Sequence, residues 1–240
     1  LRTKMKKLIF ILMVGSLFAH DVDDDFLKWK RYFRGGLIQS ENNGLGVGTY
    51  FRLKRSTKFT FKDLRLFAHW ISDDDTYFKL RYKDSYKFIK FDNLYKFTVV
   101  SFDRNEKIGL NIRSHGSSGV GIFLLDYSSG HINSEISFSY DIMDHLNNNW
   151  KSSYLKLGGF WDNELAFMES KLEFEVLYQI SDAEANDNLS RIEILFELFF
   201  PINKNFTLIT GYEREHFFHK SSGYSIFFSI GYKSPLNLKL

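Results

Sequence analysis

The residues most able to do chemistry in this sequence are a histidine and a serine two positions apart, His115-Gly116-Ser117, with an acid at Glu135. A histidine beside a hydroxyl can act as the general base of acyl transfer when a carboxylate orients its ring. Residues two apart on a strand share a face without necessarily meeting, and the Gly/Ser-rich surroundings are equally typical of a loop. We therefore interpret this segment as a polar turn and predict no catalytic residue.

A second group has side chains of the kind that bind metal ions: His216 and His219, with Glu213 and Glu215 nearby. Spacings of three and four residues bring ligands together on one face of a helix, whereas this segment lies at the end of a predicted hairpin. We interpret it as a solvated loop and predict no metal site. The absence of Cys excludes thiolate ligands and cysteine nucleophiles, and we predict no cofactor.

The third group consists of charged residues that alternate with apolar ones along the chain. Its members are Arg52, Arg65, Arg81, Arg113, Glu135, Glu173, Glu175, Glu193 and Glu197. These side chains would either line a lumen that binds or passes a small polar solute, or form ion pairs that fill a small barrel. The basic members lie in the N-terminal half and the acidic members in the C-terminal half, so a closed barrel would bring opposite charges together across its interior. This distribution favours pairing.

The elements that would position these groups are indicated by the alternation itself. Every second residue from Ile132 to Ile142 forms a mainly apolar face, and the residues between them, such as Glu135 and Asp141, form a polar face. Successive strand residues point to opposite faces, whereas a helix would scatter the same glutamates around its axis. Similar runs are predicted as strands at 45–53, 64–70, 78–82, 95–99, 108–112, 120–124, 172–180, 192–200 and 224–232.

The connections between the predicted strands alternate between short and long. We predict short turns at 127–130, 162–164 and 201–205, and longer polar loops at 143–152 and 181–190. This rhythm is typical of outer-membrane barrels, whose short turns face the periplasm and whose longer loops face outward. The many aromatic residues (26 Phe and 13 Tyr) and only 2 Pro also favour long uninterrupted strands.

The chain is therefore predicted to be all-β, an antiparallel up-and-down transmembrane β-barrel of about 12 strands in the bacterial outer membrane. We expect the barrel at 29–233, a polar N-terminal segment at 20–28 and a C-terminal tail at 234–240. The predicted partners are outer-membrane lipid and, during biogenesis, the barrel-assembly machinery. A net charge of +3 without a dense basic block gives no reason to expect nucleic-acid binding.

The N-terminus indicates export. Met5-Lys6-Lys7 is a basic start, the apolar stretch Leu8 to Ala19 follows, and a polar segment begins at Asp21. An apolar stretch of this length is typical of a signal peptide and too short to span a bilayer as a helix. We predict a signal peptide with an upstream extension over residues 1–19. Beyond Ala19 no apolar run is long enough for a membrane helix, which leaves a closed barrel as the membrane-spanning option.

One stretch of the chain is similar to a known family. Asp103-Arg104, Arg113, Gly119 to Phe123 and Ser134 to Tyr140 follow one another in an order that resembles the bacterial family of salt-induced outer-membrane proteins. The resemblance implies an outer-membrane β-barrel and no established activity. The chain departs from the family pattern at Glu41-Asn42-Asn43, at Glu135-Ile136-Ser137, and at its last residues, which do not end on an aromatic side chain.

Three functions follow as expectations. The first is a non-enzymatic outer-membrane barrel with a structural, envelope-stress or small-solute passage role. The second is an outer-membrane lipid-modifying enzyme, because His115 and Ser117 resemble the His-x-Ser arrangement of lipid A deacylases, although the flanking residues of that family are missing. The third is a soluble periplasmic β-barrel that binds a ligand. The first is the prediction that the sequence favours.

Overall fold

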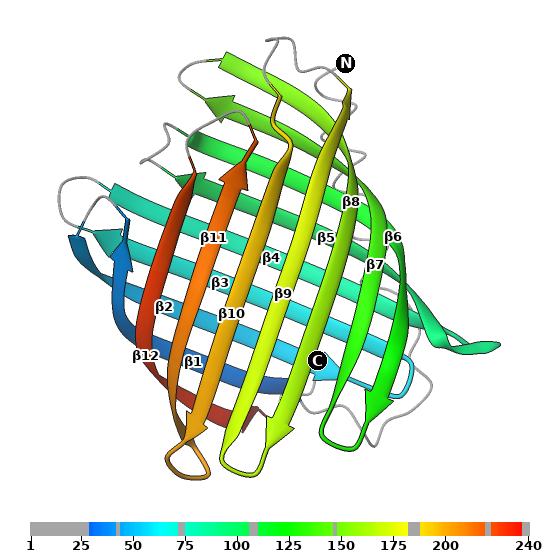
Figure 1. The fold of residues 1–240 in the computed structure, drawn as a ribbon, viewed down its shortest axis with the longest axis vertical. Helices are drawn as coiled ribbons and strands as arrows, with labels where there is room; N and C mark the ends of the chain where they lie inside the picture. Colours follow the sequence, from blue (N-terminus) through cyan, green and yellow to red (C-terminus); the bar gives the residue numbers. More distant parts are fainter. Residues whose placement is uncertain are drawn as a thin grey trace.

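In a computed structural model the chain forms a closed antiparallel barrel (Figure 1). The structure describes residues 29–41, 44–71, 75–105, 110–145, 148–181, 188–218 and 222–236. The predicted signal peptide and polar N-terminal segment lie outside the described residues. Each strand pairs with its neighbours in chain order, and β1 also pairs with β12, which closes the barrel. The prediction of an all-β up-and-down barrel of about twelve strands is confirmed by the twelve strands that the described residues form.

The strand bounds are β1 Trp29–Ser40, β2 Gly44–Ser56, β3 Thr60–Ile71, β4 Asp75–Phe88, β5 Phe91–Asn105, β6 Leu110–Tyr127, β7 Gly130–His145, β8 Asn148–Leu165, β9 Met168–Ser181, β10 Arg191–Pro201, β11 Phe206–Phe217 and β12 Gly223–Leu236. β12 therefore continues three residues beyond the predicted end of the barrel at 233. The strands tilt, so that β8 to β12 in the near wall of Figure 1 cross the far wall at an angle, as barrel closure requires. Among the described residues there is no helix long and apolar enough to cross a membrane.

The two ends of the barrel differ in their connections. One end, called the turn end below, has connections at 57–59, 89–90, 128–129, 166–167 and 202–205, and β1 begins and β12 finishes there. The other end, called the loop end, carries the longest connection of the barrel, 182–190. The predicted long loop at 143–152 is wrong, because β7 runs to His145 and β8 begins at Asn148. Met143 pairs with Trp150 and both side chains are buried, which favours extending the hairpin.

The predicted polar turn at His115 is also wrong. β6 runs without a break from Leu110 to Tyr127 and joins the two strands predicted at 108–112 and 120–124. His115 pairs with Ser101 on β5 and with Asp141 on β7. Strand preference depends on context more than on composition, and hydrogen bonding from two neighbouring strands holds this Gly/Ser-rich segment extended.

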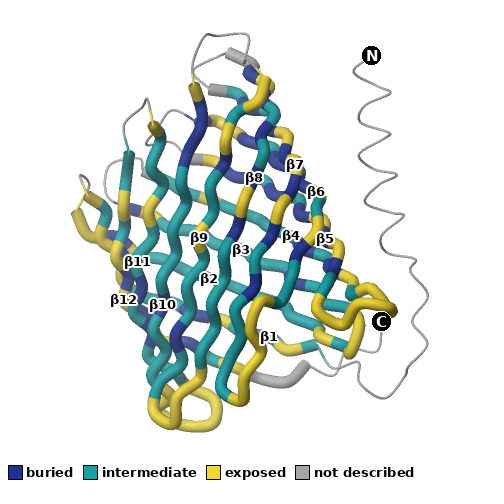
Figure 2. The backbone as a smooth tube through the Cα atoms, turned by 45° about the vertical axis from the view of Figure 1, so that its right-hand side comes forward, coloured by how far each residue is buried: buried dark blue, intermediate teal, exposed yellow. Residues whose placement is uncertain are grey.

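The two faces of the wall have opposite polarity. On β7 the side chains of Ile136, Phe138 and Tyr140 are exposed on the outside, whereas Glu135 and Asp141 are buried inside. The same alternation gives the banded pattern along β6, β7 and β8 in Figure 2. A soluble protein buries its apolar side chains, so an outer surface with many large exposed apolar residues indicates a barrel surrounded by lipid.

The seam between β1 and β12 depends on a glycine. A Cβ on Gly36 would lie 2.0 Å from the Phe228 carbonyl oxygen, whereas a Cβ on Gly35 would meet nothing within 4 Å. We expect Gly36→Ala to lower the free energy of unfolding by about 1–3 kcal/mol, because the seam must shift to relieve the overlap. Guanidinium titration in detergent micelles would measure this loss, with Gly35→Ala as the matched control. Equal unfolding midpoints for the two variants would contradict the expectation.

Candidate functional site

The interior of the barrel carries the candidate site, and the nine charged residues that the sequence singled out all lie on strands of its wall. Arg52, Arg65, Arg81 and Arg113 come from β2, β3, β4 and β6 respectively. Glu135 comes from β7, and the other four glutamates come from β9 and β10. Only two pairs form within this set: Arg65 with Glu173 at 2.9 Å, and Arg81 with Glu175 at 4.0 Å. The others pair with charged residues outside this set of nine.

One group of charges lies toward the turn end and is called the turn-end cluster. It comprises Arg52, Lys54, Asp63, Arg65, Lys171 and Glu173, from β2, β3 and β9. The fully buried Asp63 accepts hydrogen bonds from Arg52 Nε at 2.7 Å and Arg65 Nε at 2.7 Å. Arg65 also reaches across the lumen to Glu173, which in turn contacts Lys171. The cluster thus ties two opposite parts of the wall together.

A second cross-lumen contact joins Arg34 on β1 to Glu197 on β10, with both side chains buried. The Arg34 guanidinium also lies over the rings of Tyr50 and Phe227, at 4.4 and 4.5 Å from their centroids. Cation–π contacts of this kind hold a guanidinium in one orientation. The guanidinium of this pair is therefore held by two aromatic rings as well as by Glu197.

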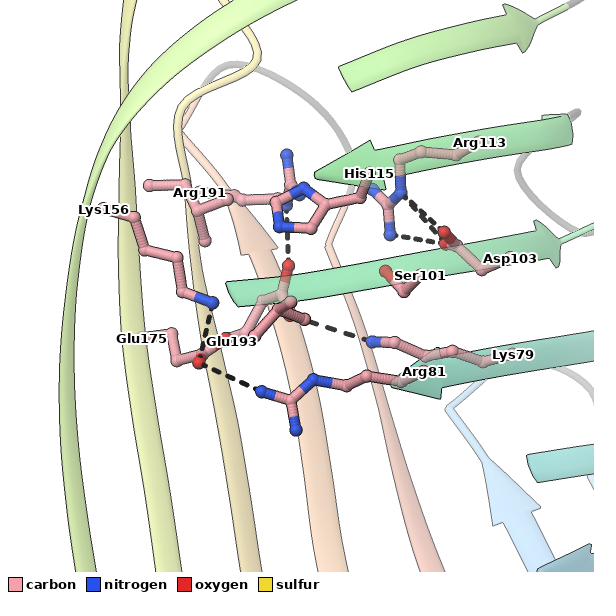
Figure 3. Close-up of a pocket in the computed structure, with 12 residues that line it drawn as sticks. Lys79, Arg81, Ser101, Asp103, Arg113, His115, Lys156, Glu175, Arg191 and Glu193 are labelled. Carbon is pink, nitrogen blue, oxygen red and sulfur yellow. Dashed lines mark hydrogen bonds and ion pairs between the residues drawn. The ribbon is translucent and has the colours of Figure 1, made fainter. Parts of the chain in front are cut away.

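The central cluster surrounds a cavity in the middle of the lumen (Figure 3). Lys156 contacts Glu175 at 2.8 Å, and Arg191 contacts Glu193 at 2.8 Å. Lys79 lies farther from Glu193, at 4.0 Å. The cavity that these residues enclose is only about 20 Å³, which is room for about one water molecule. Charged side chains therefore fill most of the lumen at this level.

His115 belongs to the same cluster and has an acid partner, but not the predicted one. Its Nδ1 lies 2.5 Å from Asp141 Oδ1, and Arg191 contacts the other Asp141 oxygen at 3.3 Å. The predicted acid, Glu135, is bound instead by Lys83 and by the Tyr95 hydroxyl. The arrangement orients a histidine ring, but the adjoining cavity is water-sized and has no room for an acyl chain.

The second group, the histidines and glutamates considered as possible metal ligands, does not come together in the structure. His216 lies within β11 rather than in the predicted loop, and its Nδ1 lies 2.6 Å from the Ser222 hydroxyl. Glu215 points elsewhere, to Arg113 at 3.1 Å and Arg191 at 3.2 Å. Within the described part of the chain no three His, Cys, Asp or Glu side chains are placed to hold a metal ion. His219 lies outside the described residues.

The residues that the sequence analysis missed share one signal with those it found. Asp63 lies two positions before Arg65, and Lys79 and Lys83 flank Arg81 at the same spacing. Residues two apart on a strand point to the same side, so all of them face the interior with the predicted members. Continuing the alternation along each strand would have found them, whereas their pairing partners depend on the register and tilt of the closed barrel.

The lumen is not uniform along its length. Toward the loop end its wall carries a group of buried apolar residues: Leu110, Met143, Trp150, Tyr154, Leu177 and Leu189. Toward the turn end it widens into an open pocket of about 540 Å³, called the vestibule. Arg34, Arg52, Lys54, Lys171 and Glu197 are among the residues that line it. The lumen thus runs from an open vestibule, past a band of ion pairs, to a loop end where apolar side chains are buried on part of the wall.

Fold, surface and interior together define the class of protein. A closed barrel with lipid-facing apolar side chains and a charged interior is a bacterial outer-membrane β-barrel. A soluble periplasmic module, one of the alternatives left open by the sequence, does not fit this exposed apolar surface.

Comparison with known proteins supports the fold. No protein-family model and no curated protein sequence matches the chain. Among solved structures, the NanC porin is similar over 84% of this chain and 98% of its own, with 9% identity and a TM-score of 0.57. The KdgM porin in complex with disordered oligogalacturonate covers 85% of this chain and 98% of its own, with 10% identity and a TM-score of 0.48. At these identities the likeness to the NanC porin shows the barrel fold and no more.

Proposed function

We propose that this outer-membrane barrel passes small polar solutes through a lumen that ion pairs keep narrow. The observation that carries the proposal is the meeting of a basic N-terminal wall and an acidic C-terminal wall inside the barrel, as in the pair of Arg65 and Glu173. Paired charges provide a polar lining without the strong preference for cations or anions that a ring of like-charged side chains would give. The role is passage rather than catalysis.

Two features favour passage over a purely structural barrel. The vestibule provides an open entrance of about 540 Å³, and the central cavity lies beyond the first band of ion pairs. The contacts Lys79–Glu193 and Arg81–Glu175 are both 4.0 Å long, so small movements of these side chains would widen the lumen. The likeness to a porin fold agrees with this function. Membership of the salt-induced family, and an envelope-stress role, stay predictions.

Planar-bilayer recordings test the proposal. We expect the folded protein to produce discrete but small current steps in KCl, because side chains restrict the lumen to about the size of a water molecule at its centre. Liposomes containing the protein should swell in arabinose, which can pass when the side chains of the 4.0 Å contacts Lys79–Glu193 and Arg81–Glu175 move apart, but not in the larger raffinose. The same amount of heat-unfolded protein serves as the control. Silence of the folded protein at every voltage, with no swelling in arabinose, would reject passage.

A further inference from the structure

The charges that face the vestibule do not balance. At its mouth, three cations (Lys30, Arg31 and Lys233) stand against three acids (Asp126, Glu164 and Glu169). Deeper inside, Arg34 and Glu197 neutralise each other as an ion pair, and Asp162 lies 3.2 Å from His131. The remaining charges at the floor are those of the turn-end cluster and of Asp162, which attracts Lys54 and Lys171. The balance of the floor therefore depends on that cluster together with Asp162.

The turn-end cluster has an excess of positive charge. It contains four cations, Arg52, Lys54, Arg65 and Lys171, and two carboxylates, Asp63 and Glu173, so its formal charge is +2. Both carboxylates are already engaged, Asp63 by two arginines and Glu173 by Arg65 and Lys171. The Lys54 ammonium lies 5.2 Å from the centroid of the Phe61 ring, and it is repelled by Arg52 and Lys171 and attracted by Asp63 and Asp162. With Asp162 included, four cations face three carboxylates, so the floor keeps a formal charge of +1. An added negative charge near Lys54 would balance this excess.

The central cluster provides the contrast. Counted together with the charged residues that adjoin the cavity lining, its basic residues are Lys79, Arg81, Lys83, Arg113, Lys156 and Arg191, and its acidic residues are Asp103, Glu135, Asp141, Glu175, Glu193, Glu213 and Glu215. Six cations face seven carboxylates, so this cluster has no excess of positive charge. The excess of positive charge is thus confined to the floor of the vestibule. That floor is also the part of the lumen with room for a ligand.

We propose that the vestibule binds a small organic carboxylate at its floor, with Lys54, Arg52 and Lys171 as the cationic contacts. An excess of charge in a partly desolvated wall is stabilised by a counter-charge. A carboxylate also accepts short, strong hydrogen bonds from ammonium and guanidinium groups. About 540 Å³ is within the range of pockets that hold small molecules. The inference deepens the proposed function, since it names the class of solute that would pass.

Three six-carbon compounds of matched size test the charge requirement: gluconate, sorbitol and 1-amino-1-deoxysorbitol, which carry a carboxylate, a hydroxyl and an ammonium group at the same end. Calorimetric titration of the folded protein in micelles measures binding without any passage. We expect gluconate to bind at least about tenfold more tightly than sorbitol or the amine, because only the carboxylate gains charged hydrogen bonds. Equal binding of sorbitol, or preference for the amine, would overturn the proposal.

A matched pair of variants tests the location. Lys54→Gln removes a cation from the vestibule floor, and Lys58→Gln removes the same charge from an exposed position in the β2–β3 turn, outside the vestibule lining. Lys54→Gln should weaken gluconate binding at least about tenfold, and Lys58→Gln should change it by less than about twofold. Equal losses in both variants would show a general surface effect and overturn the site.

A readout that requires no variant is the salt dependence of the wild-type protein. Gluconate affinity should fall as KCl is raised, because screening weakens the contacts of the bound carboxylate. An unchanged affinity would overturn the proposal. Gluconate binding by a protein that passes no solute would contradict the proposed function alone, whereas passage without preference for gluconate would contradict this inference alone.

Discussion

Replacing Asp63 by alanine is expected to lower the free energy of unfolding of the barrel by about 3–5 kcal/mol. Arg52 and Arg65 are directly opposite each other on β2 and β3, and Asp63 is the carboxylate that both of them bind. Without it two like charges face each other across the strands in a partly buried wall, and each loses a charged hydrogen bond. Guanidinium titration of the protein in lipid vesicles would measure the change.

Asp126→Ala is the control for this variant, because Asp126 is exposed beside the β6–β7 turn and its loss should cost less than about 0.5 kcal/mol. Asp63→Ala combined with Arg52→Gln should recover part of the lost stability, since it removes one of the two repelling cations. If Asp63→Ala and Asp126→Ala unfold at the same denaturant concentration, Asp63 does not stabilise the barrel in the way inferred here.

The second large effect concerns the width of the lumen. Arg65→Ala together with Glu173→Ala removes one complete cross-lumen ion pair, at no change in net charge. We expect the single-channel conductance to rise roughly tenfold, which corresponds to lowering the barrier to ion movement by about 1.4 kcal/mol. The physical reason is that two long side chains no longer bridge β3 and β9. Planar-bilayer recording under the conditions used for the wild type would measure it.

Lys58→Ala together with Asp92→Ala is the matched control, because it removes one charge of each sign at exposed turn-end positions that do not line the vestibule. Its conductance should equal that of the wild type. A double variant of Arg65 and Glu173 that stays folded, judged by heat-modifiable migration, and still conducts like the wild type would show that this pair does not restrict the lumen.

Much of the fold could be predicted because one face of every strand must meet lipid and the other the interior. That requirement makes apolar and polar residues alternate along each strand. The twelve strands of the described residues confirm the barrel that this alternation predicts. The errors fall where local composition is misleading. The segment around His115 contains residues typical of turns, yet β5 and β7 hold it extended. The 143–152 segment is polar apart from Met143, Leu146 and Trp150, and the packing of Met143 and Trp150 inside the barrel extends the hairpin.

The candidate site was less predictable than the fold. Alternation indicates which charges share a face, and the basic and acidic halves of the chain indicate that they meet across the lumen. Neither pattern indicates which carboxylate pairs with which cation, because the pairing depends on strand tilt and register. Asp141, not Glu135, reaches His115, and Asp63 lies between two arginines rather than near the acidic wall. The vestibule arises from the closed shape and has no signature along the chain.

The long sequence separation of the cross-lumen pairs has a consequence for assembly. Arg34 and Glu197 are 163 residues apart, and Arg65 and Glu173 are 108 apart. A sheet formed by the N-terminal strands alone would thus carry Arg34 and Arg65 without their acidic partners. Moving these unpaired arginines into lipid would cost desolvation free energy. Charge neutralisation and closure of the β1–β12 seam must then occur together. Folding of this barrel should accordingly be a concerted event in which curling of the whole sheet precedes full insertion, rather than a stepwise addition of hairpins within the bilayer.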